Sequence, residues 1–386
     1  YVRSKTDYDG FLSVPPFTFG DTNQSSRSKE INGGVLARYK VLDGRLDNVV
    51  SVSRGDIERR DRTDEVPSFN ADATRDNYRY QGTFKPVDMA TIAFGAEREE
   101  TKIKTASLGF FGSQSGGDSS IDSLFVLGEV KPVDTLTLSG GVRYDDHDEF
   151  GSKTTGRVGA NWRPVEMLEL RGSWGQGFKA PTIYQLVGDN SGFVNPNPDL
   201  KPEEADGWDA AATLWALDNA LSLEVGYFDL NTKNLITYVF SGRYENVAKA
   251  STKGVEATLS YAVNETLKLS GNYTYTDAKD AMANTRLIRV PKHAGFAEVD
   301  WKATGKLGLT LTARYNGKEG DVDPSSFAAV ENKSYTRLDL AARYALTDVL
   351  EMFGRVENLT DENYQDVAGY GTPGTSLYGG LRVRFQ

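Results

Sequence analysis

The chain has 386 residues, and its 44 Lys and Arg stand against 54 Asp and Glu, which gives a formal net charge of −10. This acidic balance argues against a nucleic-acid-binding protein, because such proteins normally present a basic face. Cysteine is absent, which excludes disulfides, thiolate metal sites and a cysteine nucleophile. Only His147 and His293 are available for a zinc site or a histidine-based triad, so we do not expect an enzyme. No apolar run approaches the ~18 residues of a transmembrane helix.

Eight short turns divide the chain into pairs of alternating segments. Each turn joins two predicted strands, and the strands are separated at their other ends by longer polar stretches, at 59–75, 105–120, 179–202, 318–333 and 359–375. The turns are Leu42-Asp43-Gly44, Pro86-Val87-Asp88, Pro132-Val133-Asp134, Pro164-Val165-Glu166, Leu217-Asp218-Asn219, Val263-Asn264-Glu265, Ala303-Thr304-Gly305 and Leu346-Thr347-Asp348. Short turns at one end and long loops at the other are typical of an outer-membrane barrel.

The segments between the turns alternate between apolar and polar residues. In 306–315, for example, Leu307, Leu309 and Leu311 alternate with Thr310, Thr312 and Arg314. Successive side chains of a strand point to opposite faces, so each segment has one apolar and one polar face. A β-sandwich buries its apolar face inside, whereas a membrane barrel turns it outward to lipid.

Aromatic residues favour the membrane barrel. Seven of the eight hairpins carry an aromatic residue three or four positions before the centre of the turn, namely Tyr39, Phe84, Trp162, Trp215, Tyr261, Trp301 and Tyr344. A membrane–water interface selects amphipathic rings at one height, so we interpret these residues as an interface girdle. A soluble propeller is the alternative, but propeller repeats hold four strands per period and these hold two.

The strand count gives the size of the barrel. Eight hairpins make 16 strands, and the segments 376–385 and 1–12 bring the total to 18. An even total near 18 could close by itself as an all-β transmembrane antiparallel barrel. The chain starts in mid-strand, however, and we expect that four strands and an upstream domain precede it.

Several motifs resemble those of a known family. They are Tyr144–Asp148 with Phe150-Gly151-Ser152, Gly177–Thr182, Asn195–Glu203, Lys253–Ala257, Val356–Asp361 and Gly369–Gly374. As a set they resemble the TonB-dependent outer-membrane receptors, and within that family the cobalamin (vitamin B12) transporter type, over nearly the whole chain. The final stretch resembles the family's last strand, in which Tyr378, Leu381, Val383 and Phe385 would be the signal read by the barrel-assembly machinery. Gln386 beyond that Phe is a departure from the pattern.

The resemblance implies a 22-stranded barrel in the outer membrane of a Gram-negative bacterium, filled by an N-terminal plug that contacts TonB. Neither the plug nor its TonB-binding segment is in this sequence. The implied function is import of cobalamin or a related corrinoid, bound by the extracellular loops and driven by the TonB system. A ferric-siderophore receptor and a passive 18-stranded porin remain the alternatives, since the charges of the long loops are mixed and do not decide.

Two carboxylates are candidate metal ligands. Asp9 and Asp21 lie in the first predicted loop, and the resemblance implies that such a pair binds calcium and orders the ligand-binding loops. Ca²⁺ takes six to eight oxygen ligands, so further ligands would be required; the alternative is two solvated loop carboxylates. The acidic run around His147, from Asp145 to Glu149, could hold a cation, but a charge run is more often a solvated loop. We predict no catalytic cofactor.

Six arginines are predicted to face the barrel interior, because a charged side chain facing lipid near the midplane would cost about 2–4 kcal/mol. They are Arg143, Arg314, Arg337, Arg343, Arg382 and Arg384. We expect them to pair with Asp339 or with carboxylates of the plug, in a structural role rather than in substrate steering.

Overall fold

The computed structural model describes residues 1–11, 19–108, 112–188, 194–239, 242–324, 326 and 328–384. They form two compact units. Unit 1 comprises Tyr1–Ala160, Ser173–Gly207 and Asn231–Ala250, and unit 2 comprises Asn161–Gly172, Trp208–Leu230 and Ser251–Gln386. Within the described ranges, no helix has both the length and the apolar character needed to cross a membrane.

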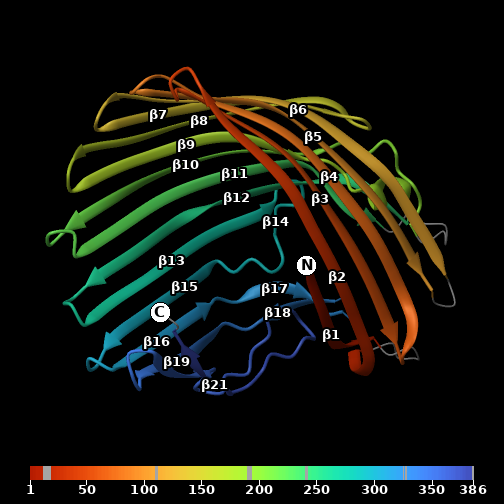
Figure 1. The fold of residues 1–386 in the computed structure, drawn as a ribbon. Helices are drawn as coiled ribbons and strands as arrows, with labels where there is room; N and C mark the ends of the chain where they lie inside the picture. The colour runs from red at the N-terminus through yellow and green to blue at the C-terminus, as the bar shows by residue number, and fades with distance from the viewer. Residues whose placement is uncertain are drawn as a thin grey trace. The chain divides into compact units, whose positions relative to one another are not determined.

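Unit 1 is built on seven consecutive antiparallel strands, each hydrogen-bonded to the next. Figure 1 shows β2 to β6 running side by side. The seven strands are β1 (Val2–Phe11), β2 (Phe19–Val41), β3 (Leu46–Thr63), β4 (Val66–Val87), β5 (Ala90–Ser107), β6 (Ser113–Val133) and β7 (Leu136–His147). The short helix α1 (Ile183–Val187) begins with a capping box, in which the Thr182 hydroxyl accepts the N–H of Gln185.

Five strands contribute residues to both units. They are β8 (Gly151–Val165), β9 (Leu168–Lys179), β10 (Glu203–Ala216), β11 (Leu221–Val239) and β12 (Arg243–Ala262). In unit 2 the principal strands pair in the order β13, β15, β16, β19, β20 and β21, again antiparallel. The elements of unit 2 are β13 (Leu267–Asp280), β14 (Thr285–Arg286), β15 (His293–Lys302), β16 (Leu307–Asn316), β17 (Glu319–Val322), β18 (Ala329–Asn332), β19 (Tyr335–Ala345), β20 (Leu350–Glu357) and β21 (Ser376–Val383).

The predicted turns and strands are confirmed. Each of the eight turns joins two consecutive strands, and the eighteen predicted strands are present among the described residues, together with the short β14, β17 and β18. The first turn needs three residues in the left-handed region, with φ of 56° at Leu42, 54° at Asp43 and 84° at Gly44. Glycine has no Cβ to clash there, which explains Gly44 at the largest of the three angles.

Two of the predicted loops are wrong. Residues 59–75 form the ends of β3 and β4, joined by a tight turn at Asp64 and Glu65, and most of 105–120 belongs to β5 and β6. Polar composition suggested loops, but cross-strand ion pairs stabilise these extensions: Arg60 lies 2.6 Å from Asp72, on the neighbouring strand. The hairpins therefore continue as sheet beyond their apolar segments, with one register shift between Asp61 and Arg62.

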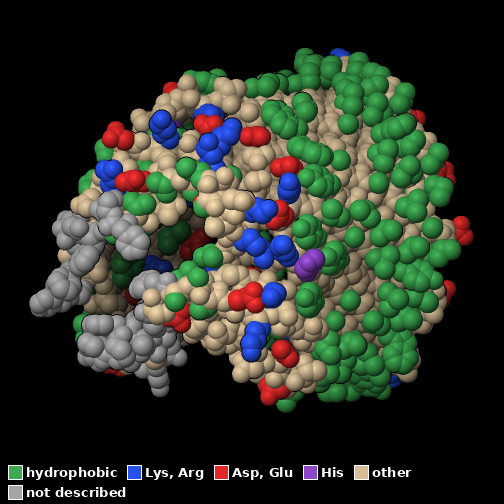
Figure 2. Space-filling model, turned by 180° about the vertical axis from the view of Figure 1, so that it is seen from behind, with side chains coloured by type: hydrophobic (Ala, Val, Ile, Leu, Met, Phe, Trp, Pro, Cys, Tyr) green, Lys and Arg blue, Asp and Glu red, His purple; other side chains and the backbone are tan. Residues whose placement is uncertain are grey.

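Strand register separates an apolar from a polar face in both units. In unit 1, Val35, Val52 and Tyr78 occupy one row of the apolar face. In unit 2, Val299 and Leu311 share such a row. Figure 2 shows a broad surface of hydrophobic side chains with few charged groups inside it. Because many large apolar side chains are exposed on this surface, it suits contact with lipid rather than with water.

The aromatic residues before the turns do not all share one face. Tyr39 and Phe84 lie on the apolar face of unit 1, in register rows with Asn48 and with Leu46. Trp215 differs, because it shares its side of β10 with Thr213, whose hydroxyl donates to Glu224, and the Arg163 guanidinium lies 4.7 Å from its ring centroid. The prediction that Trp215 faces lipid is therefore not supported by its position, since counting back from a turn does not fix the face. For the other six residues the interface girdle stays a prediction.

Candidate functional site

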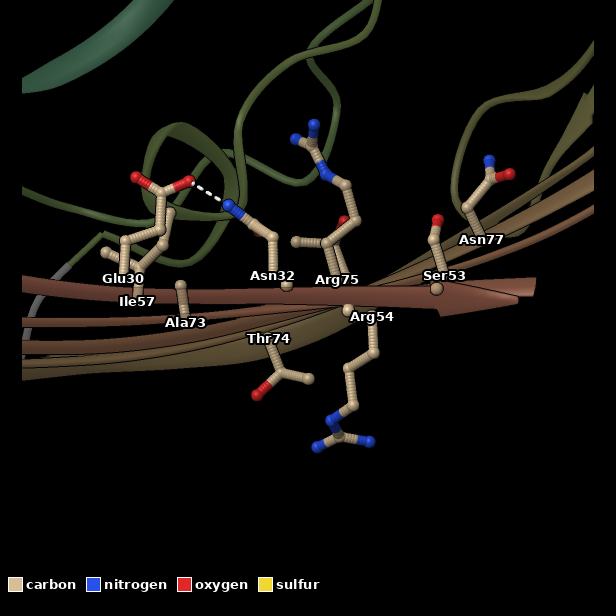
Figure 3. Close-up of a pocket in the computed structure, with 13 residues that line it drawn as sticks. Glu30, Asn32, Ser53, Arg54, Ile57, Ala73, Thr74, Arg75 and Asn77 are labelled. Carbon is tan, nitrogen blue, oxygen red and sulfur yellow. Dashed lines mark hydrogen bonds between the residues drawn. The ribbon is translucent and has the colours of Figure 1, made fainter. Parts of the chain in front are cut away.

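A groove on the polar face of unit 1 is the best candidate for a ligand-binding site. It has a volume of about 570 Å³ and lies beyond the rows of apolar residues, over β2 to β5. We call it the outer groove. Its lining includes Glu30, Asn32, Ser53, Gly55, Ile57, Ala73, Arg75, Asn77 and Thr101. Figure 3 shows the side chains of Glu30, Asn32, Arg75 and Asn77 on one side of the strands, with Arg54 and Thr74 on the other.

The floor of the outer groove depends on a glycine. Asn32, Gly55, Arg75 and Thr101 form one row across the four strands. A Cβ atom at Gly55 would lie 2.7 Å from Oδ1 of Asn32, which is closer than van der Waals contact allows. Glycine therefore leaves space between the Asn32 and Arg75 side chains.

The groove presents charged and amide groups to a ligand. Asn32 donates to Oε1 of Glu30 at 2.6 Å, and Asn77 donates to Oε1 of Glu97 at 2.8 Å. The Arg75 guanidinium has Glu99 at 3.5 Å, a long contact that leaves most of its donors available. This set of groups suits binding by hydrogen bonds and charge, and it contains no nucleophile next to a base.

A tightly bonded network lies next to the groove. The Arg143 guanidinium donates to Asp145 at 2.7 Å, to the Ser123 hydroxyl at 2.7 Å and to Glu97 at 3.2 Å. Asp145 is only 2% exposed, and the Ser123 hydroxyl also donates to it. Glu97 links this network to Asn77 of the groove.

An ion pair with a buried carboxylate lies at the outer end of β3. Asp61 accepts hydrogen bonds from Arg59 at 2.7 Å and from the Ser26 hydroxyl at 2.6 Å. Burial alone would raise the pKa of the Asp61 carboxyl, but these bonds outweigh burial and hold the pKa below its usual range. The bond from Ser26 joins the outer ends of β2 and β3 beyond the groove.

The predicted calcium ligands cannot be judged from their side chains. Asp9 lies in β1 and Asp21 in β2, and the two strands pair on either side of them through Tyr8 with Gln24 and Gly10 with Gly20. Their side chains lie outside the described part. Among the described residues there is no cluster of three or more His, Asp or Glu side chains able to hold a metal ion. Calcium binding stays a prediction.

The acidic run around His147 does not converge on one point. Asp145 lies on the polar face and accepts a hydrogen bond from Arg143, whereas Asp146 lies on the opposite face. The ring of His147 is buried, with Nδ1 accepting the Glu149 N–H at 3.1 Å and Nε2 3.0 Å from the Ser119 hydroxyl. The run is therefore a structural element of the β7 end.

The predicted pairing with Asp339 is confirmed for one of the six arginines. Arg337 pairs with Asp339 at 2.8 Å, as predicted. Arg343 pairs with Asp300, and both Arg382 and Arg384 approach Glu351. Arg314 lies in the same row as Arg337 and therefore on the same polar face. Arg382 and Arg384 thus find a carboxylate on the neighbouring β20, Arg337 finds one on its own strand, and Arg343 reaches across β16 to β15.

The residues of the predicted assembly signal do not share one face, and their role as a signal stays a prediction. In β21, Leu381 and Val383 pair with Met352 and Leu350 on the apolar face. Tyr378 points to the polar face instead, where the Arg355 guanidinium lies 4.7 Å from its ring centroid. Phe385 lies outside the described residues.

Sequence reasoning missed one feature in each unit. One is the outer groove, whose residues alternate along ordinary polar strands and form no motif. The other is a buried polar cluster in unit 2, where Asp321 accepts four hydrogen bonds, from Arg289, Asn332, Val322 and Ala368. Asn358 and Asp361 were singled out only as part of a motif; they also anchor the segment that follows β20.

Solved structures share this fold. The chain is similar to the siderophore receptor PirA from Acinetobacter baumannii, with 17% identity and a TM-score of 0.77 over 94% of this chain and 63% of that one. It is similar to the ferric-catecholate import receptor Fiu from K12 E. coli, with 14% identity and a TM-score of 0.74 over 94% and 65%. It is also similar to the ferripyoverdine receptor of the Pseudomonas aeruginosa outer membrane, with 15% identity and a TM-score of 0.75 over 97% of this chain and 60% of that one. The chain thus spans less than two thirds of the length of each.

The sequence comparison identifies the family directly. Residues 2–359 match the family described as TonB dependent receptor-like, beta-barrel. The match covers most of the chain and agrees with the antiparallel strands, the short turns and the two-faced register. The chain therefore belongs to the TonB-dependent receptor β-barrel family.

Proposed function

We propose that this chain is the barrel part of an outer-membrane receptor that captures a ferric siderophore and imports it with energy from the TonB system. The observation that carries the proposal is the outer groove, which offers a guanidinium and side-chain amides on the polar face, beyond the apolar rows. In a membrane barrel the polar face lines the interior, so the groove would open toward the extracellular end. The three similar receptors named above are receptors of siderophores or of ferric catecholates, which supports this cargo over cobalamin.

The partners follow from the same proposal. TonB would act through a plug on the complete protein, outer-membrane lipid would cover the apolar face, and the barrel-assembly machinery would read the β21 end. Arg75 would bind an anionic oxygen of the siderophore complex through charge-assisted hydrogen bonds. We propose no catalytic step, because the family consists of transport receptors.

Binding by the complete receptor tests the cargo. Purified receptor would be titrated with ferric enterobactin, ferripyoverdine and cobalamin, each with calcium and with a chelator, and binding followed by tryptophan fluorescence. Saturable binding of a ferric siderophore, weakened at least tenfold by Arg75→Gln, is the expected result. The control is Arg54→Gln, whose side chain points away from the groove.

Two outcomes would change the proposal. Saturable binding of cobalamin alone, lost on chelation and in an Asp9→Ala, Asp21→Ala variant, would establish the corrinoid cargo and the calcium site. Conductance of the complete receptor without binding of any of the three ligands would indicate the passive porin.

A further inference from the structure

A second cavity lies deeper on the polar face of unit 1. It has a volume of about 250 Å³, and the side chains of Arg79, Phe125, Arg143 and Arg157 contribute to its lining. They come from β4, β6, β7 and β8, and we call them the arginine cluster. The Phe125 ring stands in the middle, with the Arg79 guanidinium 5.2 Å and the Arg143 guanidinium 6.0 Å from its centroid. Two cationic groups therefore lie over one apolar ring, and a third, Arg157, lines the same cavity.

The three arginines differ in their partners. Arg143 is held by Glu97, Asp145 and Ser123, so its charge is compensated. Arg79 donates to the side-chain oxygen of Gln81, a neutral group. Within the described ranges, neither Arg79 nor Arg157 has a carboxylate within 4.0 Å. Other polar-face arginines of unit 1 do have one: Arg38 pairs with Asp47, Arg59 with Asp61 and Arg75 with Glu99.

The space beside Arg157 is open. Gly175 is its neighbour on β9, where a Cβ atom would lie 3.6 Å from the Cβ of Arg157, and Gly141 lines the same cavity from β7. With glycines at these positions, neither contributes a side chain beside Arg157, which is itself exposed. Its donors remain available to a ligand in the cavity.

The arginine cluster is connected to the outer groove along β4. Arg75, Asn77 and Arg79 follow one another on the same face of that strand. At about 3.3 Å per residue, Arg79 lies roughly 13 Å further along the strand than Arg75. Asn77 lines the groove and bonds to Glu97, which in turn holds Arg143. A ligand that leaves the groove along this face meets the cluster next.

We propose that Arg79 and Arg157, on the two sides of Phe125, bind an anionic oxygen-bearing group of the imported ligand during its passage from the outer groove into the barrel. The cluster is a second, transient binding site, and Arg143 acts there as a positioning residue. The choice of cargo rests on the proposed function, whereas the site itself requires only an anion. Two guanidinium groups without carboxylate partners would supply charge-assisted hydrogen bonds to it.

An anion probe tests the site independently of the cargo. Crystals of the complete receptor would be soaked in sodium bromide, and the anomalous signal of bromide measured. The expected result is a bromide ion bonded to both Arg79 and Arg157, which disappears in the Arg79→Gln, Arg157→Gln variant. A plug carboxylate bonded to both guanidinium groups, or no bromide at the site in the wild type, would overturn the proposal.

Transport kinetics test the role of the site. In cells that express the complete receptor, the Arg79→Gln, Arg157→Gln variant should take up iron-labelled ferric enterobactin at least fivefold more slowly, with an unchanged Kd in energy-depleted cells. The Arg79→Lys, Arg157→Lys variant should recover much of the rate. Arg163→Gln is the control, since Arg163 is on a polar face but stacks on Trp215.

Three results would contradict this role. Unchanged uptake would remove the transient site, and a parallel loss of affinity would place both arginines in the capture site. If vancomycin enters cells of the Arg79→Gln, Arg157→Gln variant while their uptake of ferric enterobactin stays normal, the two arginines contact the plug instead of the ligand. If the wild type takes up no ferric siderophore, the proposed function is wrong, and the bromide experiment still decides the site.

Discussion

The carboxylate of Asp321 accepts the backbone N–H of Ala368 at 2.7 Å, across 47 residues of sequence. This bond ties the segment between β20 and β21 to the hairpin of β17 and β18. The adjoining contacts strengthen the connection: Tyr335 donates to Asp366 at 2.7 Å, and its ring stacks on Tyr364 with centroids 4.1 Å apart. Two long connections on the same side of unit 2 are therefore held together by buried polar groups.

Removal of the Asp321 carboxylate should release this connection. Asp321→Ala leaves the N–H of Ala368 and the amide of Asn332 without their acceptor, and we expect a loss of about 2–4 kcal/mol of local stability. Hydrogen exchange of the amides of residues 359–375 would measure the loss. The control is Glu331→Gln in the same hairpin, whose exposed pair with Lys318 should contribute less than about 1 kcal/mol. Equal exchange in both variants would contradict the prediction.

Acidity should act on this connection in two opposite ways. The hydrogen bonds to Asp321 overcome the effect of burial and lower its pKa, so its contribution is present at neutral pH and is lost as the pH falls below its ordinary value near 4. Burial, together with the charges of Asp366 and Asp321, raises the pKa of Glu319. The protonated Glu319 therefore stabilises the connection at low pH, and this contribution to stability is lost as the pH rises through the raised pKa.

The neutral isostere tests the second effect. Glu319→Gln should protect the amides of residues 359–375 more strongly than the wild type at pH 8, and the difference should disappear near pH 4. Hydrogen exchange corrected for intrinsic rates would measure both values. A variant that is less protected than the wild type at pH 8 would show that the ionised Glu319 stabilises the connection.

The barrel-forming pattern is readable from sequence because lipid acts on every second residue over many strands. The turn at Leu42 to Gly44, for example, is marked by both its residues and the alternation around it. The polar ends of β3 and β4 are not readable in this way, because no lipid contact constrains their composition. There, the pairing of Arg60 with Asp72 decides that the chain continues as strand.

The site was less accessible to sequence reasoning for a related reason. Gly55 and Arg75 stand in neighbouring strands 20 residues apart in sequence, and only the register places them in one row. Trp215 illustrates the same limit, since its distance from the turn did not reveal its face. Side-chain direction near a strand end follows from pairing, which a single sequence does not specify.

A side chain at Gly55 should close the outer groove. Gly55→Val would push its side chain into the space beside Asn32, and we expect at least a tenfold weaker binding of the ferric siderophore by the complete receptor. The binding titration described above would measure it. Gly128→Val is the matched control, because its Cβ would meet nothing within 4 Å and Gly128 does not line the groove. Equal affinity in both variants would exclude the groove from ligand binding.

Quenching by lipid should distinguish the tryptophans by the face on which they lie. Trp162 and Trp301 are 47% and 45% exposed, and Trp301 shares the apolar row of Leu267 and Leu309. In vesicles that contain brominated lipid, single-tryptophan variants that keep Trp162 or Trp301 should be strongly quenched, because bromine quenches only on close contact. A variant that keeps Trp215 should retain most of its fluorescence, since its ring packs against Arg163 on the polar face.

The same experiment tests the depth of the tryptophans in the membrane. Interface aromatics lie at the level of the headgroups, so bromine near the glycerol end of the acyl chains should quench Trp162 and Trp301 more than bromine near the methyl end. Comparable quenching of all three tryptophans would mean that the polar face also meets lipid, which an interior wall cannot do. Strong quenching of Trp215 alone would reverse the assignment of the two faces. We do not expect this result, because the polar face carries charged side chains that are costly to place in hydrocarbon.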